Sequence, residues 1–395
     1  MLQTTSTERR AAGGHRPRSG GSVKMRPWVL RSRSFLDIST RSCDVAPDRN
    51  RSIMKHADPS IGGIERILLI RLKAIGDVVF TLPAVHALHE IFPHAEISFL
   101  TSTEHAPILR GFGGVHKILT VDRSLYKRMA IPAIWNHTLA LIGTLRRARY
   151  DLVVDFQGYG ETALLARLTG APRRWGMTRD GFRKRAFTRR VVCDHRRHPA
   201  VWNRLLLAEC GLDLPSLCNR FVLSDDGVKE ALAFFHANSC DPDRPVLFIQ
   251  PFTSSPFKTW PLDRFVELGR AFRGRDVQVI FGGGPGNREA LEPVRGAGFP
   301  VSAGLSLLAS AGLVKLSTVT VGGDTGLLHL AVAMGKRVVM LMESVGPGSA
   351  TPLGHEEWVV LPGTPSGTAS IQLGEVIAAC ERALREYAAP PGVSA

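Results

Sequence analysis

Asp77 is the first residue of this chain whose type and position could do chemistry. It follows a short aliphatic run that ends at Arg71 and, together with Gly76, it opens the next amphipathic stretch. A carboxylate at the carboxyl end of a strand can act as a general base for a bound hydroxyl. The plainer interpretation is a helix cap, because Asp is favoured at the N-terminus of a helix.

A hydroxyl-rich loop follows a second aliphatic run, at residues 250–261. Hydroxyls, backbone N–H groups, one lysine and a helix start together make an arrangement suited to anions. The polar residues of this loop are Thr253, Ser254, Ser255, Lys258 and Thr259. A solvated polar loop is the alternative. The loop lacks the glycine spacing of a Walker A motif.

Residues 320–335 form a third candidate loop. Gly322 and Gly323 allow a sharp turn, and Asp324-Thr325-Gly326 opens a strongly apolar helix. The free N–H groups and the dipole at a helix start favour a phosphate. His329, five residues after Asp324, could face the same ligand. By default, however, a lone histidine between Leu328 and Leu330 is a packing residue.

Other cofactor patterns fail. In residues 281–290 a dinucleotide fingerprint that starts at Gly282 would need a glycine where Asn287 stands. The only D-x-D string, Asp241–Asp243, precedes a strand and is typical of a turn. No His, Cys or carboxylate spacing indicates zinc. We therefore expect neither a metal nor a cofactor.

The elements that must position these loops are short continuous aliphatic runs that alternate with amphipathic stretches. Continuous runs predict strands that are covered on both faces, which is typical of parallel α/β sheets. The predicted strands cover 65–71, 95–100, 116–121, 151–156, 245–250, 277–281, 318–323 and 337–342. A linker at 211–219 divides them, so we expect two doubly wound domains facing a cleft, at 64–215 and 216–395.

The formal net charge of +15 is unevenly distributed. Residues 1–60 carry twelve Lys or Arg against five Asp or Glu, without apolar periodicity. They predict a disordered basic tail, with a transit peptide or a translation start at Met54 as alternatives. The six cysteines form no C-x-x-C pair, which favours a reducing compartment. No apolar run reaches 18 residues, because Asn136 and His137 interrupt the longest candidate, from Met129 to Leu145.

Taken together, these segments resemble glycosyltransferase family 9, the ADP-heptose:lipopolysaccharide heptosyltransferases, over about residues 64–385. Four ordered matches carry the resemblance, and together they are far more specific than any one alone. They are RLKAIGDVVFTLPAV, DLVVDFQGYGETALLARLTGAPRRWGM, KTWPLDRF and GGDTGLLHLAVAMG. One departure is ESVGPGSATPLG, which stands where the family usually has a G-P-T-D-P-like loop.

The resemblance implies the GT-B fold and an inverting, metal-independent transfer of heptose from ADP-heptose to the lipopolysaccharide inner core. The acceptor would bind to the N-terminal domain and the nucleotide-sugar to the C-terminal one. Asp77 would be the base, and Lys258 would hold the diphosphate as well as assist catalysis. The implied donor site comprises Thr253, Ser254, Lys258, Glu289, Asp324, Thr325, Gly326 and His329. A basic stretch suited to an acidic acceptor comprises Arg179, Arg183, Lys184 and Arg185.

The resemblance also implies a cytoplasmic enzyme and leaves open a peripheral contact with the inner face of the cytoplasmic membrane. Two alternatives remain. One is a family member that uses another nucleotide-sugar or acceptor. The other is a basic nucleic-acid-binding protein, which is disfavoured because residues 1–60 contain only Trp28 and Phe35 as aromatic residues.

Overall fold

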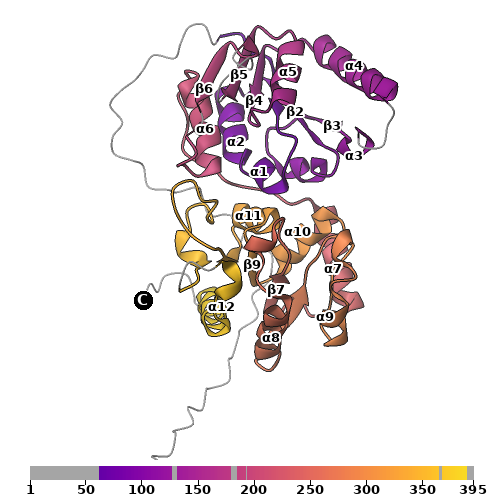
Figure 1. The fold of residues 1–395 in the computed structure, drawn as a ribbon, viewed down its shortest axis with the longest axis vertical. Coiled ribbons are helices and arrows are strands. Elements are labelled where there is room, and N and C mark those ends of the chain that lie inside the picture. Colours follow the sequence, from indigo (N-terminus) through magenta and orange to yellow (C-terminus); the bar gives the residue numbers. More distant parts are fainter. Residues whose placement is uncertain (1–61, 127–130, 179–184, 193, 364–366, 389–395) are drawn as a thin grey trace, which may run out of the picture. The chain divides into compact units, whose positions relative to one another are not determined.

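The computed structural model describes residues 62–126, 131–178, 185–192, 194–363 and 367–388, and all of them belong to one unit of the chain. The first part of this unit is built on a six-stranded, all-parallel sheet (Figure 1). Its strands are β1 (Arg66–Ile70), β2 (Glu96–Ser102), β3 (Lys117–Val121), β4 (Leu152–Asp155), β5 (Arg173–Thr178) and β6 (Arg189–Val192). They lie in the order β3-β2-β1-β4-β5-β6.

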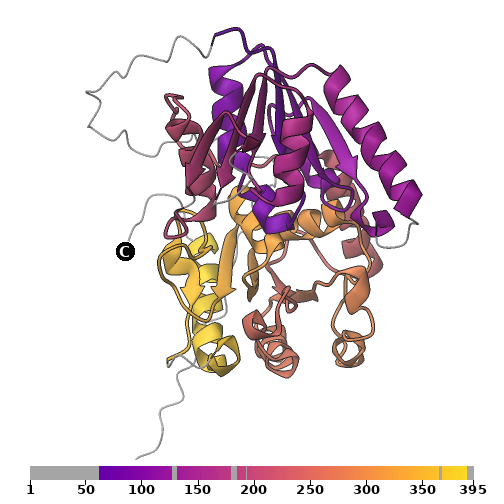
Figure 2. The same cartoon turned by 45° about the horizontal axis from the view of Figure 1, so that its top comes forward.

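Alternate residues of β1 explain why both faces of this sheet are covered. Ile67 and Leu69 join a core with α2 and α6, whereas Leu68 and Ile70 join a second core with α4 and α5. Figures 1 and 2 show α4 and α5 side by side. The helices are α1 (Ile75–Val79), α2 (Leu82–Ile91), η2 (Ala106–Gly111), α3 (Arg123–Tyr126), α4 (Ile131–Arg147), α5 (Gly160–Leu168) and α6 (Pro199–Glu209).

A five-stranded parallel sheet organises the second part of the unit. Its strands are β7 (Val246–Gln250), β8 (Gln278–Phe281), β9 (Val319–Gly323), β10 (Arg337–Leu341) and β11 (Val359–Val360), in the order β11-β10-β9-β7-β8. Its helices are α7 (Asp225–Ala237), η4 (Pro256–Lys258), α8 (Leu262–Arg273), η5 (Pro285–Asn287), α9 (Glu292–Gly296), α10 (Leu307–Leu316), α11 (Gly326–Ala333), η6 (Glu356–Trp358), η7 (Thr368–Ser370) and α12 (Leu373–Ala388).

The second sheet repeats the alternation of the first. Leu247 and Ile249 of β7 pack with α8 and α12, whereas Val246 and Phe248 pack with α7, α10 and α11. Each sheet has a switch point, a pair of neighbouring strands whose following connections run to opposite sides of the sheet. This point lies between β1 and β4 in the first sheet and between β7 and β9 in the second. Ligands of open parallel sheets bind beyond the carboxyl ends of the strands at such points.

The eight strands expected from the sequence are confirmed, with ends that differ by one or two residues. Strands β5 and β6 were missed, because their arginines hid the aliphatic pattern of a buried strand. Residues 287–295, which are amphipathic in sequence, do not form one continuous helix: η5 ends at Asn287 and the short α9 begins at Glu292, with a turn between them. No helix within the described residues has the length and apolar character needed to span a membrane.

Candidate functional site

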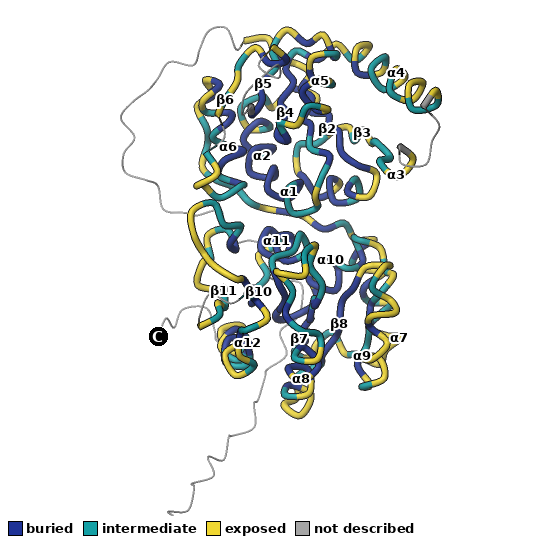
Figure 3. Tube along the Cα trace, viewed as in Figure 1, coloured by how far each residue is buried: buried dark blue, intermediate teal, exposed yellow. Residues whose placement is uncertain are grey.

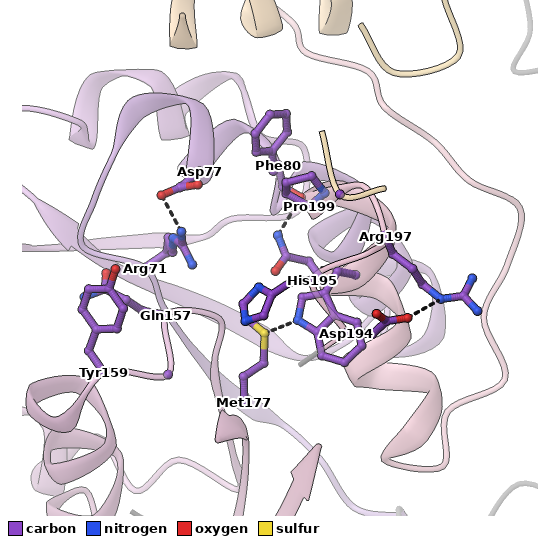
Figure 4. Close-up of a pocket in the computed structure, with 14 residues that line it drawn as sticks. Arg71, Asp77, Phe80, Gln157, Tyr159, Met177, Asp194, His195, Arg197 and Pro199 are labelled. Carbon is purple, nitrogen blue, oxygen red and sulfur yellow. Dashed lines mark hydrogen bonds and ion pairs between the residues drawn. The ribbon is translucent and has the colours of Figure 1, made fainter. Parts of the chain in front are cut away.

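A cavity of about 460 Å³ lies at the carboxyl ends of β1 and β4, where the first sheet reverses its strand order (Figure 4). The loops after these two strands and the start of α6 supply most of its lining. The residues that line it are Arg71, Asp77, Phe80, Gln157, Gly158, Tyr159, Met177, Asp194, His195, Arg197, Pro199, Trp202, Asn203 and Gly348.

Asp77 is the third residue of α1. It is not the N-cap, which was the plainer interpretation of the sequence. The helix begins two residues earlier, so Ala74 is the N-cap, and its N–H donates to Asp77 Oδ2 at 3.1 Å. Arg71 Nη2 lies 2.5 Å from the same oxygen. The Asp77 side chain keeps 40% of its surface exposed, and it lines the cavity. The carboxylate is therefore fixed through one oxygen while remaining accessible to a ligand.

Gln157 holds the loop that carries Asp77. Its Oε1 accepts hydrogen bonds from the N–H groups of Leu72 at 2.8 Å and Lys73 at 3.3 Å. Its own N–H donates to Asp155 Oδ1 at 2.9 Å. The loop after β4 therefore braces the loop after β1, although more than eighty residues separate them in the sequence.

Asp155 is fully buried beneath this brace. Burial raises the pKa of its carboxyl to about 6, although hydrogen bonds from the Gly158 N–H, the Thr162 hydroxyl and the Gln157 N–H act in the opposite direction. The penalty for a buried charge exceeds the benefit of these donors. Asp155 therefore takes up a proton near pH 6, close to the loop that positions Asp77.

The far side of the cavity is apolar and aromatic. Trp202 Nε1 donates to the sulfur of Met177, and Asn203 Nδ2 donates to the Phe80 carbonyl at 2.9 Å (Figure 4). Tyr159 also lines the cavity but is exposed, with Lys73 Nζ 5.1 Å from its ring centre. An apolar wall with a few fixed polar groups is the usual lining of a small-molecule site.

The second switch point joins three of the residues expected at an anion site. Lys258, after β7, places its Nζ 2.5 Å from Asp324 Oδ2, and Asp324 follows β9. His329 Nε2 lies 2.8 Å from the other oxygen, Oδ1. Burial alone would raise the pKa of Asp324, but the hydrogen bonds and charges of His329 and Lys258 lower it to about 2. The Asp324 carboxylate is therefore ionised at neutral pH.

Thr253 and Ser254 lie beside a separate hollow of about 370 Å³ in the same loop. Thr253 Oγ1 hydrogen-bonds with Thr259 Oγ1 at 2.8 Å and donates to the Ser255 carbonyl at 2.7 Å, which folds the loop on itself. The loop crosses close over Gly323, where a Cβ would come within 2.6 Å of Lys258 O. Glycine is thus required for the loop to reach its position over β9.

The start of α11 packs against the start of α1. Thr325 is the N-cap of α11, and a Cβ on Gly326 would lie 2.6 Å from Gly76 N. Phe80 extends this contact, because its ring centre is 4.5 Å from that of His329 and 5.2 Å from that of His198. The helix that carries Asp77 is thus in direct contact with the helix that follows Asp324.

Burial keeps the His198 ring neutral at physiological pH. It lowers the pKa of the imidazole to about 4, although the Thr351 carbonyl, 3.0 Å from Nε2, favours the charged form. His198 Nδ1 accepts from Ala200 N at 3.2 Å, so a neutral ring with its proton on Nε2 satisfies both contacts.

The remaining expected residues are not gathered here. Glu289 is exposed after η5, and it lines neither the cavity nor the hollow. Arg185 is exposed and likewise lines neither, whereas Arg179, Arg183 and Lys184 lie outside the described residues. Sequence reasoning missed the positions of Arg71, Gln157, Tyr159 and Trp202 in the site. The signal for the first three was their place directly after aliphatic strands.

Comparison with known proteins agrees with this architecture. The family model of glycosyltransferase family 9 (heptosyltransferase) matches residues 138–369. Lipopolysaccharide heptosyltransferase 1 of Pseudomonas aeruginosa is 26% identical over 307 residues, which are 74% of this chain and 82% of that protein.

Solved structures agree as well. A glycosyl transferase family 9 protein from Veillonella parvula superposes with a TM-score of 0.71 at 20% identity, covering 82% of this chain and 97% of its own. The Escherichia coli ADP-heptose lps heptosyltransferase II gives 0.68 at 21% identity, with 82% and 100% covered. These likenesses confirm the GT-B fold expected from the sequence.

Proposed function

The chain belongs to glycosyltransferase family 9, the heptosyltransferases, and from that premise we propose that it transfers a heptose from ADP-heptose to the inner core of lipopolysaccharide, with inversion at the anomeric carbon. The membership makes it a glycosyltransferase. The observation that carries the proposal is the placement of Asp77 and of the Lys258–Asp324 pair at the two switch points, on loops whose helices α1 and α11 are in contact.

Asp77 is the proposed general base. Both of its hydrogen-bonding contacts within the described residues are made by Oδ2, so Oδ1 is available to accept the proton of an acceptor hydroxyl. As that proton moves to Asp77, the hydroxyl oxygen attacks the anomeric carbon and the bond from this carbon to the diphosphate breaks. General-base assistance of this kind contributes about 10²–10⁴-fold to a rate.

Lys258 is the proposed ligand of the donor diphosphate. Its ammonium group is held by Asp324, and the leaving diphosphate develops negative charge as the bond breaks. A fixed cation at that point stabilises the transition state more than the ground state. Further hydroxyl and backbone donors to the diphosphate would come from Thr253, Ser254, Thr325 and Gly326. Asp324, oriented by His329, would accept hydrogen bonds from sugar hydroxyls. Glu289 stays a more distant candidate for the donor site.

The cavity of the first sheet is the proposed acceptor site. Its aromatic wall offers a surface for a sugar ring, and Arg71 and Arg197 bring positive charge to its lining. In this proposal residues 64–215 bind the acceptor and residues 216–395 bind the donor. Arg179, Arg183, Lys184 and Arg185 would extend the positive charge toward a phosphorylated acceptor, and the reaction would take place in the cytoplasm at the inner face of the membrane.

A thermal-shift panel tests the donor. The full-length chain is heated with ADP-heptose and, separately, with UDP-, GDP- and dTDP-sugars. We expect ADP-heptose to raise the Tm most, because at equal concentration the ligand that binds the folded state most tightly stabilises it most. A larger shift with another nucleotide-sugar would instead identify a family member with a different donor. Transfer to a lipopolysaccharide inner-core acceptor, with the anomeric configuration read by NMR, tests the reaction itself.

A further inference from the structure

Helix α4 presents large apolar side chains away from the protein. Trp135 has 63% of its surface exposed and Leu139 has 58%, whereas Leu145 is the only buried side chain among residues 132–147. Figure 3 shows α4 mostly in the colours of exposed and intermediate residues. Trp135, Leu139, Gly143 and Arg147 follow one another at intervals of four residues, so they share one face of the helix. Exposed side chains of this size at helical spacing mark an interaction surface.

The neighbouring helix continues this surface. Arg146 Nε of α4 donates to the Leu168 carbonyl at the end of α5, at 2.9 Å, which ties the two helices together. Both cover the same face of the first sheet, so their outward residues point the same way. On α5 these include Leu164, which is 53% exposed, and Arg167. We call the set of Trp135, Leu139, Arg146, Arg147, Leu164 and Arg167 the α4–α5 face.

The charge around this face has almost one sign. No acidic residue occurs between Asp122 and Asp151 in the sequence, whereas Arg146 and Arg147 are exposed at the end of α4 and Arg149 is exposed just beyond it. Glu161 is the exposed carboxylate of α5. An isologous contact between two copies of the chain would set these arginines against each other. The occupant favoured by charge is therefore an anionic surface.

The topology connects this face to the cavity. Helix α4 follows β3 in a parallel sheet, so its first half, with Trp135, starts from the same edge at which β1 and β4 end. Asp77 and Gln157 lie at that edge. An occupant that contacts Trp135 would accordingly lie near the side of the domain from which the cavity is lined.

We propose that the α4–α5 face docks on an anionic lipid bilayer. Trp135, Leu139 and Leu164 enter the boundary between headgroups and acyl chains, and Arg146, Arg147 and Arg167 contact lipid phosphates. An amphipathic helix with Trp and Leu on one face and basic residues beside them binds membranes in this way. The inference extends the proposed function, whose acceptor is anchored in a membrane. Its test uses no substrate, so the docking proposal and the proposed function can each fail without the other.

The test is co-sedimentation of the full-length chain with vesicles of phosphatidylcholine and phosphatidylglycerol, compared with vesicles of phosphatidylcholine alone. We expect the mixed vesicles to bind the native chain more tightly. The double replacement Trp135→Ser, Leu139→Ser should lower this binding about tenfold or more, at low and high salt alike. The double replacement Arg146→Gln, Arg147→Gln should lower it at low salt and have little effect at high salt.

Tyr387→Ser is the matched control, because Tyr387 is an aromatic residue of α12 with 46% of its surface exposed. Every variant keeps the basic residues 1–60, so their contribution to vesicle binding is the same throughout. Equal binding by the α4 variants and the control would overturn the proposal. So would a native dimer that the Trp135, Leu139 replacement dissociates, since a second copy would then cover the face.

Hydrogen exchange of the native chain gives a readout that does not depend on any variant. On addition of the mixed vesicles, the amides of α4 should exchange more slowly, while those of α12 should not change. Equal exchange in α4 with and without vesicles would also overturn the proposal.

Discussion

Arg71 Nη2 lies 2.5 Å from Asp77 Oδ2, and the same guanidinium is tied to two carbonyls. Its Nε donates to Lys73 O at 3.0 Å and its Nη1 donates to Phe156 O, so it is fixed to the loops after both β1 and β4. A guanidinium with three of its nitrogens engaged has little freedom to move. Arg71 thereby sets the orientation of the carboxylate proposed as the base.

Replacing Arg71 tests whether this orientation matters for the reaction. Arg71→Gln should lower kcat about tenfold or more, because an unanchored Asp77 spends less time in the reactive geometry. Arg71→Lys should restore part of the rate, since it keeps the charge without the fork. The affinity for ADP, measured by calorimetry, should stay the same in both variants. A fall in ADP affinity that matches the fall in kcat would show a general structural defect instead.

Asp77→Asn keeps the size and the hydrogen-bonding shape of the side chain but removes the base. Transfer should fall by about 10²–10⁴-fold, whereas ADP binding should be nearly intact. Steady-state kinetics and calorimetry on the same preparation measure the two quantities. Asp263→Asn, an exposed carboxylate of α8, is the control and should keep full activity. Normal turnover by Asp77→Asn would refute the assignment.

Lys258→Ala removes the cation at the second switch point. We expect ADP to bind about ten- to a hundredfold more weakly, because a charge-assisted hydrogen bond to phosphate is lost and Asp324 keeps only His329 as a partner. Transfer should also slow. Arg270→Ala, which removes an exposed cation of α8, is the control for a change in net charge. If both variants bind ADP like the native chain, Lys258 does not contact the diphosphate.

Asp155→Asn should change how stability depends on pH. The raised pKa means that the folded state holds the Asp155 proton up to about pH 6, whereas an unfolded chain releases it near 3.8, the ordinary pKa of an aspartate. The contribution of this one carboxyl to the unfolding free energy therefore falls by about 3 kcal/mol as the pH rises from below 4 to above 6. The amide does not titrate, so the variant should gain stability relative to the native chain over this range.

Urea unfolding at a series of pH values between 4 and 8 measures this difference. Any change in unfolding free energy that the amide causes by itself is the same at each pH. The informative quantity is therefore the slope of the unfolding free energy against pH. The exposed Asp243→Asn replacement is the control for a carboxylate lost without burial. Equal slopes for the two variants would contradict a buried, proton-binding Asp155.

Local sequence determined much of this protein. Aliphatic runs such as 66–70 and 246–250 identify strands, because a strand buried on both faces has to be apolar throughout. Local sequence also placed Asp77, Lys258 and Asp324 in the segments that follow strands. It failed for β5, whose arginines masked the pattern, and for the start of α1, where backbone geometry put Ala74 at the cap.

The tertiary structure decided which of these loops meet. Strand order sets β1 beside β4, so Gln157 can hold the loop of Asp77 across more than eighty residues. It also sets β7 beside β9, which brings Lys258 to Asp324 across 66 residues. Side-chain patterns within a strand report burial but not the identity of the neighbouring strand. That choice is made by the packing of whole sheets and helices, which no single segment encodes.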